Sequence, residues 1–271
     1  MKFRVVIVIY NCECEVSKCI SSILGLNNQC VELLICDNST IAETAKKNEQ
    51  FCKLQKIHYI NMQGNAGLSK AYNRALIQIS PDQWLVLFDQ DTIVNPTYFD
   101  KLEKSILFYP NTFIHVPVVK SKEVQISPCV IKGHVVTRMT VTHYGLHSNI
   151  TAINTGMAIR ASVFEKTGNY NEVIFLDYVD HYFIRNFNKL YHNMAVFNCT
   201  LKQEFSDHDH SDLKTDVARF IIYKKDFYLF CKDSISGHIY YLCKIFYRSL
   251  KLTLYHKSLV FIKQLWEVPL K

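Results

Sequence analysis

The stretch WLVLFDQDT, residues Trp84 to Thr92, places two acids directly after a run of apolar residues. Such a run predicts a strand buried in the core, where a carboxylate is costly unless it is paired or bound to a metal. With one residue between them, Asp89 and Asp91 can both reach one hard divalent cation whose other ligands come from water and substrate phosphates. The pattern therefore predicts chemistry on a nucleotide diphosphate. The alternative is a solvated turn in which Asp89 caps the next segment.

Strand-like and helix-like segments alternate through the residues that precede this stretch. The apolar runs are Phe3 to Tyr10, Val31 to Cys36 and Ile57 to Ile60, and helical spacing covers Val16 to Leu24 and Leu68 to Ile79. Continuous apolar strands are typical of a parallel sheet that is covered on both faces. The alternation predicts an α/β fold with a mostly parallel, Rossmann-like sheet, three layers and right-handed crossovers.

Polar residues follow the predicted strands at the points where the strands end. They are Asn11, Asp37 with Asn38, the segment Asn61 to Asn65, and Asp89 with Asp91. Ligands of such sheets bind at the carboxyl ends of the strands. The four segments therefore predict one binding edge.

The pattern changes in the second half of the chain. From about Thr112 to Arg160 short strands predominate and predict an antiparallel part, in which Gly156 permits either close approach by a ligand or a β-bulge. Leu176 to Leu190 has helical spacing and would carry Asp177 and Asp180 on one face. Residues from 214 onward predict a helical extension.

The composition indicates one large core with room for an appendage, since 49% of the 271 residues are hydrophobic. From Lys214 onward eleven Lys or Arg residues accompany four acids, a net charge of +7 that equals the net charge of the whole chain. The ten cysteines lack paired metal-ligand spacing and indicate reduced thiols in a cytosolic protein. No apolar stretch reaches the roughly 18 residues of a spanning helix.

Six stretches carry a further signal. They are Val5 to Asn11 (VVIVIYN), Ile35 to Ser39 (ICDNS), Asn65 to Ala75 (NAGLSKAYNRA), Leu85 to Thr92 (LVLFDQDT), Asn154 to Arg160 (NTGMAIR) and Phe164 to Asp180 (FEKTGNYNEVIFLDYVD). Together they resemble the family 2 glycosyltransferases of the GT-A fold, in particular the bacterial rhamnosyltransferase-like branch that builds O-antigen and capsule. The resemblance implies a GT-A catalytic domain over 1–213, with a nucleotide-binding half (1–111) and an acceptor half (112–213), before the basic, aromatic extension (214–271).

The resemblance also implies a nucleotide-sugar site at the predicted edge. Asp91 would bind Mg²⁺ or Mn²⁺, and Asp89 would hold the ribose, a metal-bound water or the same metal. Asp37 would accept the imide N–H of a uracil or thymine. The nucleotide pocket as a whole would be lined by Tyr10, Asn11, Asp37, Asn38, Asn65, Gly67, Asn73, Asp89 and Gly156. The alternative for these residues is a loop and a helix N-terminus that need small and capping side chains.

For the acceptor, the resemblance implies that Asp180 is the general base. It would deprotonate an acceptor hydroxyl during in-line attack that inverts the anomeric carbon. Asp177 would raise the pKa of its partner by repulsion or hold an acceptor hydroxyl. A surface helix with two solvated acids is the alternative.

Three positions depart from the family pattern. Tyr182 replaces an acid two residues after the base, and Arg185 comes one place early. Gln203 stands where many members carry a histidine that helps to hold the metal or the diphosphate. His208 or His210 could substitute for it, unless both belong to a solvated loop.

The resemblance therefore predicts an inverting, metal-dependent hexosyltransferase. It would move rhamnose, galactose or galactofuranose from a UDP- or dTDP-sugar to a lipid-linked glycan of a surface polysaccharide such as O-antigen. This would take place at the cytoplasmic face of the bacterial inner membrane. The alternatives are a catalytically silent scaffold that binds sugar nucleotide and, with little support, a nucleic-acid-binding protein. Homo-oligomerisation is left open.

The extension fits either of two roles. Its interleaved aromatic and basic residues suit a peripheral helix attracted to anionic lipid, and equally a helical pair packed on the catalytic domain with a basic solvent face. The residues behind the first interpretation are Phe227, Tyr228, Phe230, Tyr240, Tyr241, Phe246, Tyr247, Tyr255, Lys224, Lys225, Lys244, Arg248, Lys251 and Lys257.

Overall fold

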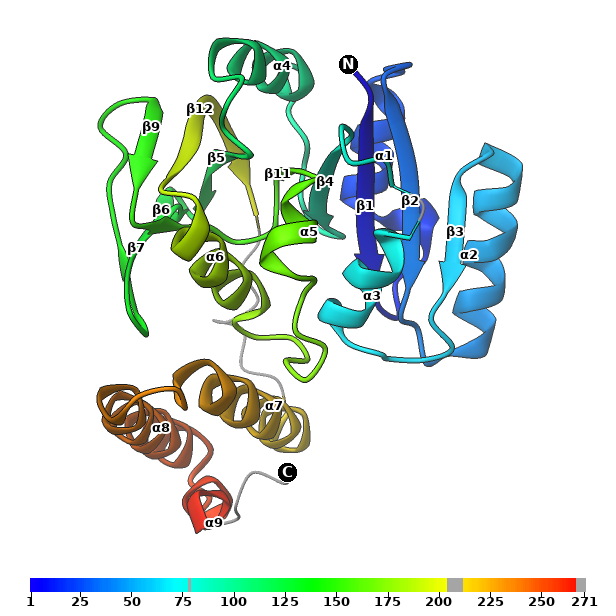
Figure 1. The fold of residues 1–271 in the computed structure, drawn as a ribbon. Helices are drawn as coiled ribbons and strands as arrows, with labels where there is room; N and C mark the ends of the chain where they lie inside the picture. The colour runs from blue at the N-terminus through cyan, green and yellow to red at the C-terminus, as the bar shows by residue number, and fades with distance from the viewer. Residues whose placement is uncertain (78, 204–211, 267–271) are drawn as a thin grey trace.

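The computed structural model describes residues 1–77, 79–203 and 212–266. The strands of its main sheet are β1 (Phe3–Ile9), β2 (Val31–Asp37), β3 (His58–Asn61), β4 (Trp84–Asp89), β5 (Ile114–Ser121), β6 (Val124–Ser127), β9 (Gly145–Ser148), β11 (Met157–Arg160) and β12 (Asn193–Lys202). Their order in the sheet is β3-β2-β1-β4-β11-β5-β12-β9, and β6 pairs with β5 (Figure 1). The two halves of the chain therefore share one sheet.

The first four strands form the parallel part that the alternation predicts. β1 pairs in parallel with β2 and β4, and β2 pairs in parallel with β3. The accompanying helices are η1 (Cys14–Val16), α1 (Lys18–Gly25), α2 (Ala42–Gln55), α3 (Leu68–Ala75) and α4 (Tyr98–Phe108). Helix α1 begins after Ser17, because the Ser17 hydroxyl accepts a hydrogen bond from the Ile20 N–H at 3.3 Å and caps the helix.

The second half adds antiparallel strands, as its short apolar segments predict. β11 lies antiparallel between β4 and β5, β12 runs parallel to β5, and β9 is antiparallel to β12. A small separate sheet contains β7 (Cys129–Lys132), β8 (Val135–Arg138) and β10 (Ile150–Thr151). The predicted fold class, a mostly parallel α/β sheet with a smaller antiparallel part and C-terminal helices, is confirmed.

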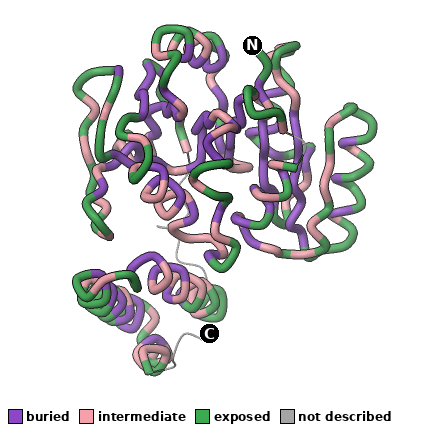
Figure 2. Tube along the Cα trace, in the orientation of Figure 1, coloured by how far each residue is buried: buried purple, intermediate pink, exposed green. Residues whose placement is uncertain are grey.

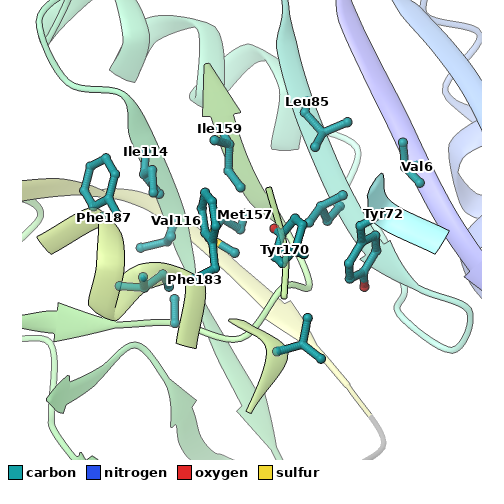
Figure 3. Packing of buried hydrophobic residues seen from close by; sticks show 14 of the residues in the cluster. Val6, Tyr72, Leu85, Ile114, Val116, Met157, Ile159, Tyr170, Phe183 and Phe187 are labelled. Carbon is teal, nitrogen blue, oxygen red and sulfur yellow. The ribbon is translucent and has the colours of Figure 1, made fainter. Parts of the chain in front are cut away.

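The core on one face of the sheet fixes α6 (Val179–Leu190) in place. The ring of Tyr170 lies 5.2 Å from that of Tyr72 on α3 and 4.7 Å from that of Phe183 on α6, measured between centroids. Figure 3 shows these residues beside Met157 of β11. Each large apolar side chain buried in this way contributes roughly 1.5–3 kcal/mol. Packing therefore determines where α6 and its first-turn acid lie relative to the strand ends.

Helix α6 follows α5 (Val163–Thr167) and starts later than the sequence predicts. The apolar spacing predicts a helix from Leu176, whereas α6 begins at Val179. Tyr178 interrupts the helical conformation with a left-handed φ of 62°. Asp177 therefore lies in the loop before the helix, and the prediction that it shares a helical face with Asp180 is wrong.

Residues 212–266 form the helical extension, with α7 (Leu213–Cys231), α8 (Ile235–His256) and α9 (Val260–Trp266). Figure 1 shows these helices as a group beside α6. The Asp212 carboxylate caps α7, since its Oδ1 accepts hydrogen bonds from the N–H groups of Lys214 and Thr215 at 2.9 and 3.1 Å. The Tyr178 ring stacks on those of Phe227 and Phe230, with centroids 4.9 and 4.8 Å apart, and so joins the extension to the rest of the protein.

Several residues behind the lipid-facing interpretation lie in the core of the extension. Phe227 and Phe230 are fully buried and Tyr241 is almost so, while the buried Lys224 ammonium donates to the Gln264 carbonyl. Figure 2 shows such buried positions alternating with exposed ones along the three helices. The prediction that this set as a whole faces lipid is wrong, because these side chains hold the helices together. Within the described ranges, no helix combines the length and the apolar character needed to cross a membrane.

Candidate functional site

The carboxyl ends of β1, β2 and β4 meet at one edge of the sheet, as predicted. The register pairs Ile9 with Asp37 and Val8 with Asp89, so the two acids lie on either side of β1. The Asn38 N–H donates to the Ile9 carbonyl at 2.8 Å and continues the pairing beyond β2. Parallel pairing therefore brings together polar residues that are far apart in the sequence.

Asp89 is held by residues from the second half of the sheet. Its N–H donates to Thr155 Oγ1 at 2.9 Å, and its Oδ2 accepts a hydrogen bond from Gln203 Nε2 at 2.6 Å. Gln203 reaches this position because its neighbour Lys202 forms an antiparallel bridge with Ile93. The end of β12 thus closes over the end of β4.

Two other carboxylates influence Asp89 at this edge. Burial raises the pKa of Asp89 to about 6, hydrogen bonds with Thr155 and Gln203 oppose the shift, and repulsion from Asp91 and Asp180 adds to it. Asp91, two residues after Asp89, and Asp180 on α6 thus belong to the electrostatic surroundings of Asp89. A divalent cation here would favour the ionised form of Asp89.

The oxygen atoms at this edge suit a hard divalent cation. Asp89 and Asp91 supply carboxylates, and Gln203 Oε1 is buried with no hydrogen-bond partner among the described residues. Mg²⁺ and Mn²⁺ prefer oxygen ligands, and Mg²⁺ sites take only one or two carboxylates beside water and substrate phosphates. The described residues contain no cluster of three or more His, Cys, Asp or Glu ligands. Asp89, Asp91 and Gln203 are therefore the groups that could hold the metal.

Asp180 lies in the first turn of α6. Its side chain is 16% exposed, and its Oδ1 accepts a hydrogen bond from the His181 N–H at 2.6 Å. The His181 ring lies close by, with Nδ1 3.7 Å from Asp180 Oδ1 and 2.7 Å from Thr151 Oγ1. Asp180 thus keeps a partly open carboxylate in the first turn of α6.

Tyr10 and Asn11, which follow β1, have different surroundings. Tyr10 is 46% exposed, so its ring is open to contact from a nucleobase. Asn11 has a left-handed φ of 46°, and its Oδ1 accepts hydrogen bonds from the N–H groups of Thr40 and Ile41 at 2.9 and 3.2 Å. Asn11 therefore caps the segment before α2, and its contact with the nucleoside stays a prediction.

Asp37 is buried, and both of its carboxylate oxygens accept hydrogen bonds. Oδ1 accepts from the Ser39 N–H at 2.8 Å, and Oδ2 accepts from Asn48 Nδ2 and the Tyr59 hydroxyl, both at 2.9 Å. The residue is 1% exposed. Contact between this carboxylate and a uracil or thymine would require the surrounding groups to move.

The loop before α3 packs tightly against the segment that leads to Asp180. Gly67 has φ 86°, and a Cβ there would lie 2.6 Å from the Phe175 ring. The Leu68 N–H donates to the Phe175 carbonyl at 2.7 Å, and Asn38 Nδ2 donates to the Gly67 carbonyl at 3.2 Å. Gly67 is therefore required where the two loops meet.

Asn65 and Asn73 also make contacts within the protein. Asn65 Oδ1 accepts from the Gly67 N–H at 3.3 Å. The Asn73 amide makes two hydrogen bonds of 2.9 Å with the main chain of Tyr170 and donates to Glu172 Oε1 at 2.9 Å. Both residues shape the loops of the site, and direct contact of either with the nucleotide stays a prediction.

Gly156 faces protein side chains. With φ 75°, it leaves a space in which a Cβ would lie 2.5 Å from Leu201 and 2.7 Å from Pro117. Its N–H donates to the Leu87 carbonyl, and its carbonyl accepts from the Tyr98 hydroxyl, both at 2.7 Å. Close packing against Leu201 and Pro117 therefore accounts for a glycine here, and its contact with the nucleotide stays a prediction.

Helix α7 binds the segment before α6 through hydrogen bonds and an ion pair. The fully buried Asp226 carboxylate accepts hydrogen bonds from the N–H groups of Phe175, Leu176 and Asp177 at 2.9, 2.7 and 2.9 Å. Burial raises the pKa of Asp226, and the three hydrogen bonds oppose the shift. The Asp177 carboxylate is itself bound at two points by the Arg219 guanidinium, at 2.5 and 2.9 Å. The Asp177 carboxylate thus links the loop to α7, and its role beside the base stays a prediction.

Arg185 also turns toward the extension. Its Nη1 donates to the Phe230 carbonyl at 2.6 Å, and its Nη2 pairs with the Asp233 carboxylate at 3.0 Å. The guanidinium lies 4.6 Å from the centre of the Phe230 ring, within range of a cation–π interaction. The arginine that comes one place early in the family pattern thus ties α6 to the extension.

Residues 4–168, more than half of the chain, match glycosyl transferase family 2. The chain belongs to this family. The glycosyltransferase GlyA of Streptococcus pneumoniae serotype 4 is 28% identical over 109 residues, which are 40% of this chain and 15% of that protein.

Solved structures of other proteins share this fold. Residues 1–349 of S. aureus TarS superpose with a TM-score of 0.54 and 12% identity, over 84% of this chain and 66% of that one. GalNAc-T7, solved with UDP, GalNAc and Mn²⁺, superposes with a TM-score of 0.60 and 14% identity, over 75% of this chain and 44% of that one. This glycosyltransferase therefore spans less than two thirds of each of these chains.

The hydrogen bonds of Asp226 with the segment before α6 lead to a testable prediction. Asp226→Asn should lower the free energy of unfolding by about 1–3 kcal/mol, because the amide has one acceptor oxygen and leaves buried N–H groups unsatisfied. Urea denaturation measures the effect. Asp233→Asn is the control, since its 52% exposed carboxylate should contribute under about 1 kcal/mol. Equal stability of the two variants would contradict the prediction.

Four residues contribute to the site or its supports without appearing in the sequence-based prediction. Thr155 lies within the matching stretch NTGMAIR, but nothing in that stretch distinguishes it from its neighbours. Asp226 carries a weak signal, since it lies four residues before Phe230 and so shares a helix face with an apolar residue. Nothing in the sequence singles out Arg219 or His181. His208 and His210, the candidate substitutes for the family histidine, lie outside the described residues.

Proposed function

We propose that this family 2 glycosyltransferase is an inverting, metal-dependent enzyme that uses a UDP- or dTDP-sugar. The two acids directly after β4 carry the proposal, because they are candidate metal ligands at the strand ends, with Asp89 beside the end of β1 and held by Gln203. Asp180, in the first turn of α6, is the candidate base. Two similar structures support a uridine donor: TarS was solved in complex with UDP-GlcNAc, and GalNAc-T7 with UDP, GalNAc and Mn²⁺.

In this mechanism Asp180 accepts the proton of an acceptor hydroxyl. The acceptor oxygen forms a bond to the anomeric carbon while the bond from that carbon to the diphosphate oxygen breaks, and the electron pair leaves with the diphosphate. Asp91, with Asp89 and Gln203, would hold Mg²⁺ or Mn²⁺, which neutralises charge on the leaving diphosphate when bound. Attack from the face opposite the leaving group inverts the configuration.

The proposed sugar is rhamnose, with galactose or galactofuranose as the next candidates. The proposed acceptor is a hydroxyl of a lipid-linked glycan of a surface polysaccharide, such as O-antigen, at the cytoplasmic face of a bacterial inner membrane. The six matching stretches support the sugar class. The resemblance supports the membrane location, and the hydrogen bonds of Asp226 join the basic extension to the segment before Asp180.

A panel of sugar nucleotides tests this function. We expect a UDP- or dTDP-sugar to raise the melting temperature only when Mn²⁺ or Mg²⁺ is present, since a ligand at 100 times its Kd stabilises the folded state by about 2.7 kcal/mol. The same donor should be hydrolysed slowly in the absence of acceptor. Stabilisation that does not depend on metal would contradict the proposed mechanism. Binding without any hydrolysis or transfer would identify a silent scaffold.

A further inference from the structure

Helix α8 of the extension is apolar on two sides. One side packs on α7 and α9 through buried residues that include Tyr241, Ile245 and Leu252. The other side faces outward, and Figure 2 shows exposed positions recurring along this helix. A helix that packs along a single apolar stripe would be polar there.

The outward side is a continuous stripe, which we call the α8 stripe. Its members, with their exposed fractions, are Ile235 (83%), Ile239 (58%), Leu242 (64%), Phe246 (59%), Leu250 (41%) and Leu254 (69%). Spacings of three and four residues align them along one face of the helix. Tyr247, 67% exposed, widens the stripe. Isolated exposed apolar residues are common, but a contiguous row of this length marks an interaction surface.

The surroundings of the α8 stripe are basic. Helix α8 contains no Asp or Glu, and Lys244 and Lys251 are exposed, seven residues apart on one side of the stripe. The four acids of the described part of the extension all make hydrogen bonds, and the Asp212 carboxylate caps the start of α7. Asp216 accepts a hydrogen bond from His256 at 2.7 Å, Asp226 holds the segment before α6, and Asp233 pairs with Arg185. Asp233, two residues before Ile235, is 52% exposed but paired with Arg185, so the exposed charges on α8 itself are positive.

We propose that α8 lies in the headgroup region of an anionic bilayer, with the α8 stripe among the acyl chains and Lys244 and Lys251 at the phosphates. Charge complementarity favours this occupant over a second copy of the chain, whose lysines would repel those of the first. The contact surface differs from the aromatic set that the sequence indicates, since Phe227, Phe230 and Tyr241 are inside the extension. The inference rests on the proposed function in one respect, since a lipid-linked acceptor would lie at the same bilayer.

Co-sedimentation of the full chain with vesicles tests the proposal. We expect binding to vesicles of phosphatidylcholine with phosphatidylglycerol, little binding to phosphatidylcholine alone, and weaker binding at high salt. Lys244→Gln combined with Lys251→Gln should reduce partitioning into anionic vesicles about 30-fold, from the usual contribution of a basic residue near such a surface. Leu242→Ser combined with Phe246→Ser should reduce it about 100-fold or more at either salt concentration.

Leu54→Ser is the matched control, because Leu54 on α2 is 80% exposed and lies outside the extension. It should bind vesicles as the wild type does, and the melting temperatures of all variants should agree within a few degrees. Equal sedimentation of the wild type and both double variants would overturn the proposal. The proposal would also be overturned if the wild type did not bind vesicles but formed a dimer in light scattering, and if Leu242→Ser combined with Phe246→Ser dissociated that dimer.

Sugar transfer to a soluble acceptor, measured on the same preparations, separates this inference from the proposed function. Transfer that persists while the wild type fails to bind vesicles contradicts only the bilayer contact. Vesicle binding that depends on the α8 stripe, in a protein that neither hydrolyses nor transfers any donor, contradicts only the proposed function.

Discussion

Asp91→Asn is expected to remove metal-dependent donor binding and to lower sugar transfer close to background. The physical reason is that an amide oxygen carries no net charge, so it binds a hard divalent cation more weakly than the carboxylate it replaces. Without the cation, the charge that develops on the leaving diphosphate is not neutralised. Calorimetric titration of a nucleoside diphosphate with and without Mn²⁺ measures the binding, and a transfer assay measures the turnover.

Asp89→Asn is the matched control for this variant. Asp89 is held by Thr155 and Gln203, and it lies in the same short segment as Asp91. We expect Asp89→Asn to weaken metal-dependent donor binding to a level that is still detectable, because the direct carboxylate ligand remains at Asp91. A titration in which Asp91→Asn keeps the metal dependence of the wild type would refute the assignment of Asp91.

Asp180→Asn is expected to lower turnover by a factor on the order of 10² or more while donor affinity stays near that of the wild type. The amide cannot accept the proton of the acceptor hydroxyl, but the metal and nucleotide contacts proposed for Asp89 and Asp91 remain. Initial rates at saturating donor and acceptor, together with donor titrations, separate the two effects. A large loss of donor affinity would instead indicate that Asp180 supports the donor site.

Asp177→Asn provides the comparison, since it removes a nearby carboxylate that is bound to Arg219. The pair is partly exposed, with side chains 41% and 20% accessible for Arg219 and Asp177, so its loss should change stability by about 1 kcal/mol or less. Turnover should fall much less than in Asp180→Asn. If Asp177→Asn instead shows the loss of turnover and Asp180→Asn stays active, the base has been assigned to the wrong acid.

The sheet edge could be predicted because it depends on local patterns. Apolar runs that end in polar residues identify parallel strands and their carboxyl ends, and parallel neighbours always end on the same side. Asp37 and Asp89 therefore lie on either side of β1 whatever the loops between them do. The position of Asp180 relative to that edge follows from the packing of Tyr170 and Phe183, which the apolar pattern alone does not reveal.

The start of α6 and the contacts of the extension could not be predicted in this way. The apolar spacing of residues 176–178 predicts helix there. The helix starts only after Tyr178, because this residue has a left-handed backbone while its ring stacks on Phe227 and Phe230. Asp177 pairs with an arginine 42 residues away. The close packing at Gly156 likewise depends on the side chains of Pro117 and Leu201, which lie on other strands.

The sequence by itself determined the α/β class, the order of its segments, the acids that follow β4 and the basic character of the extension, because each of these follows from neighbouring residues. The tertiary structure alone decided which acid lies beside Asp89, which glycines serve packing, and which apolar residues of the extension are buried or left in the outward stripe of α8. Those outcomes depend on partners distant in the sequence. The free energy of such contacts arises only when the helices and the sheet come together.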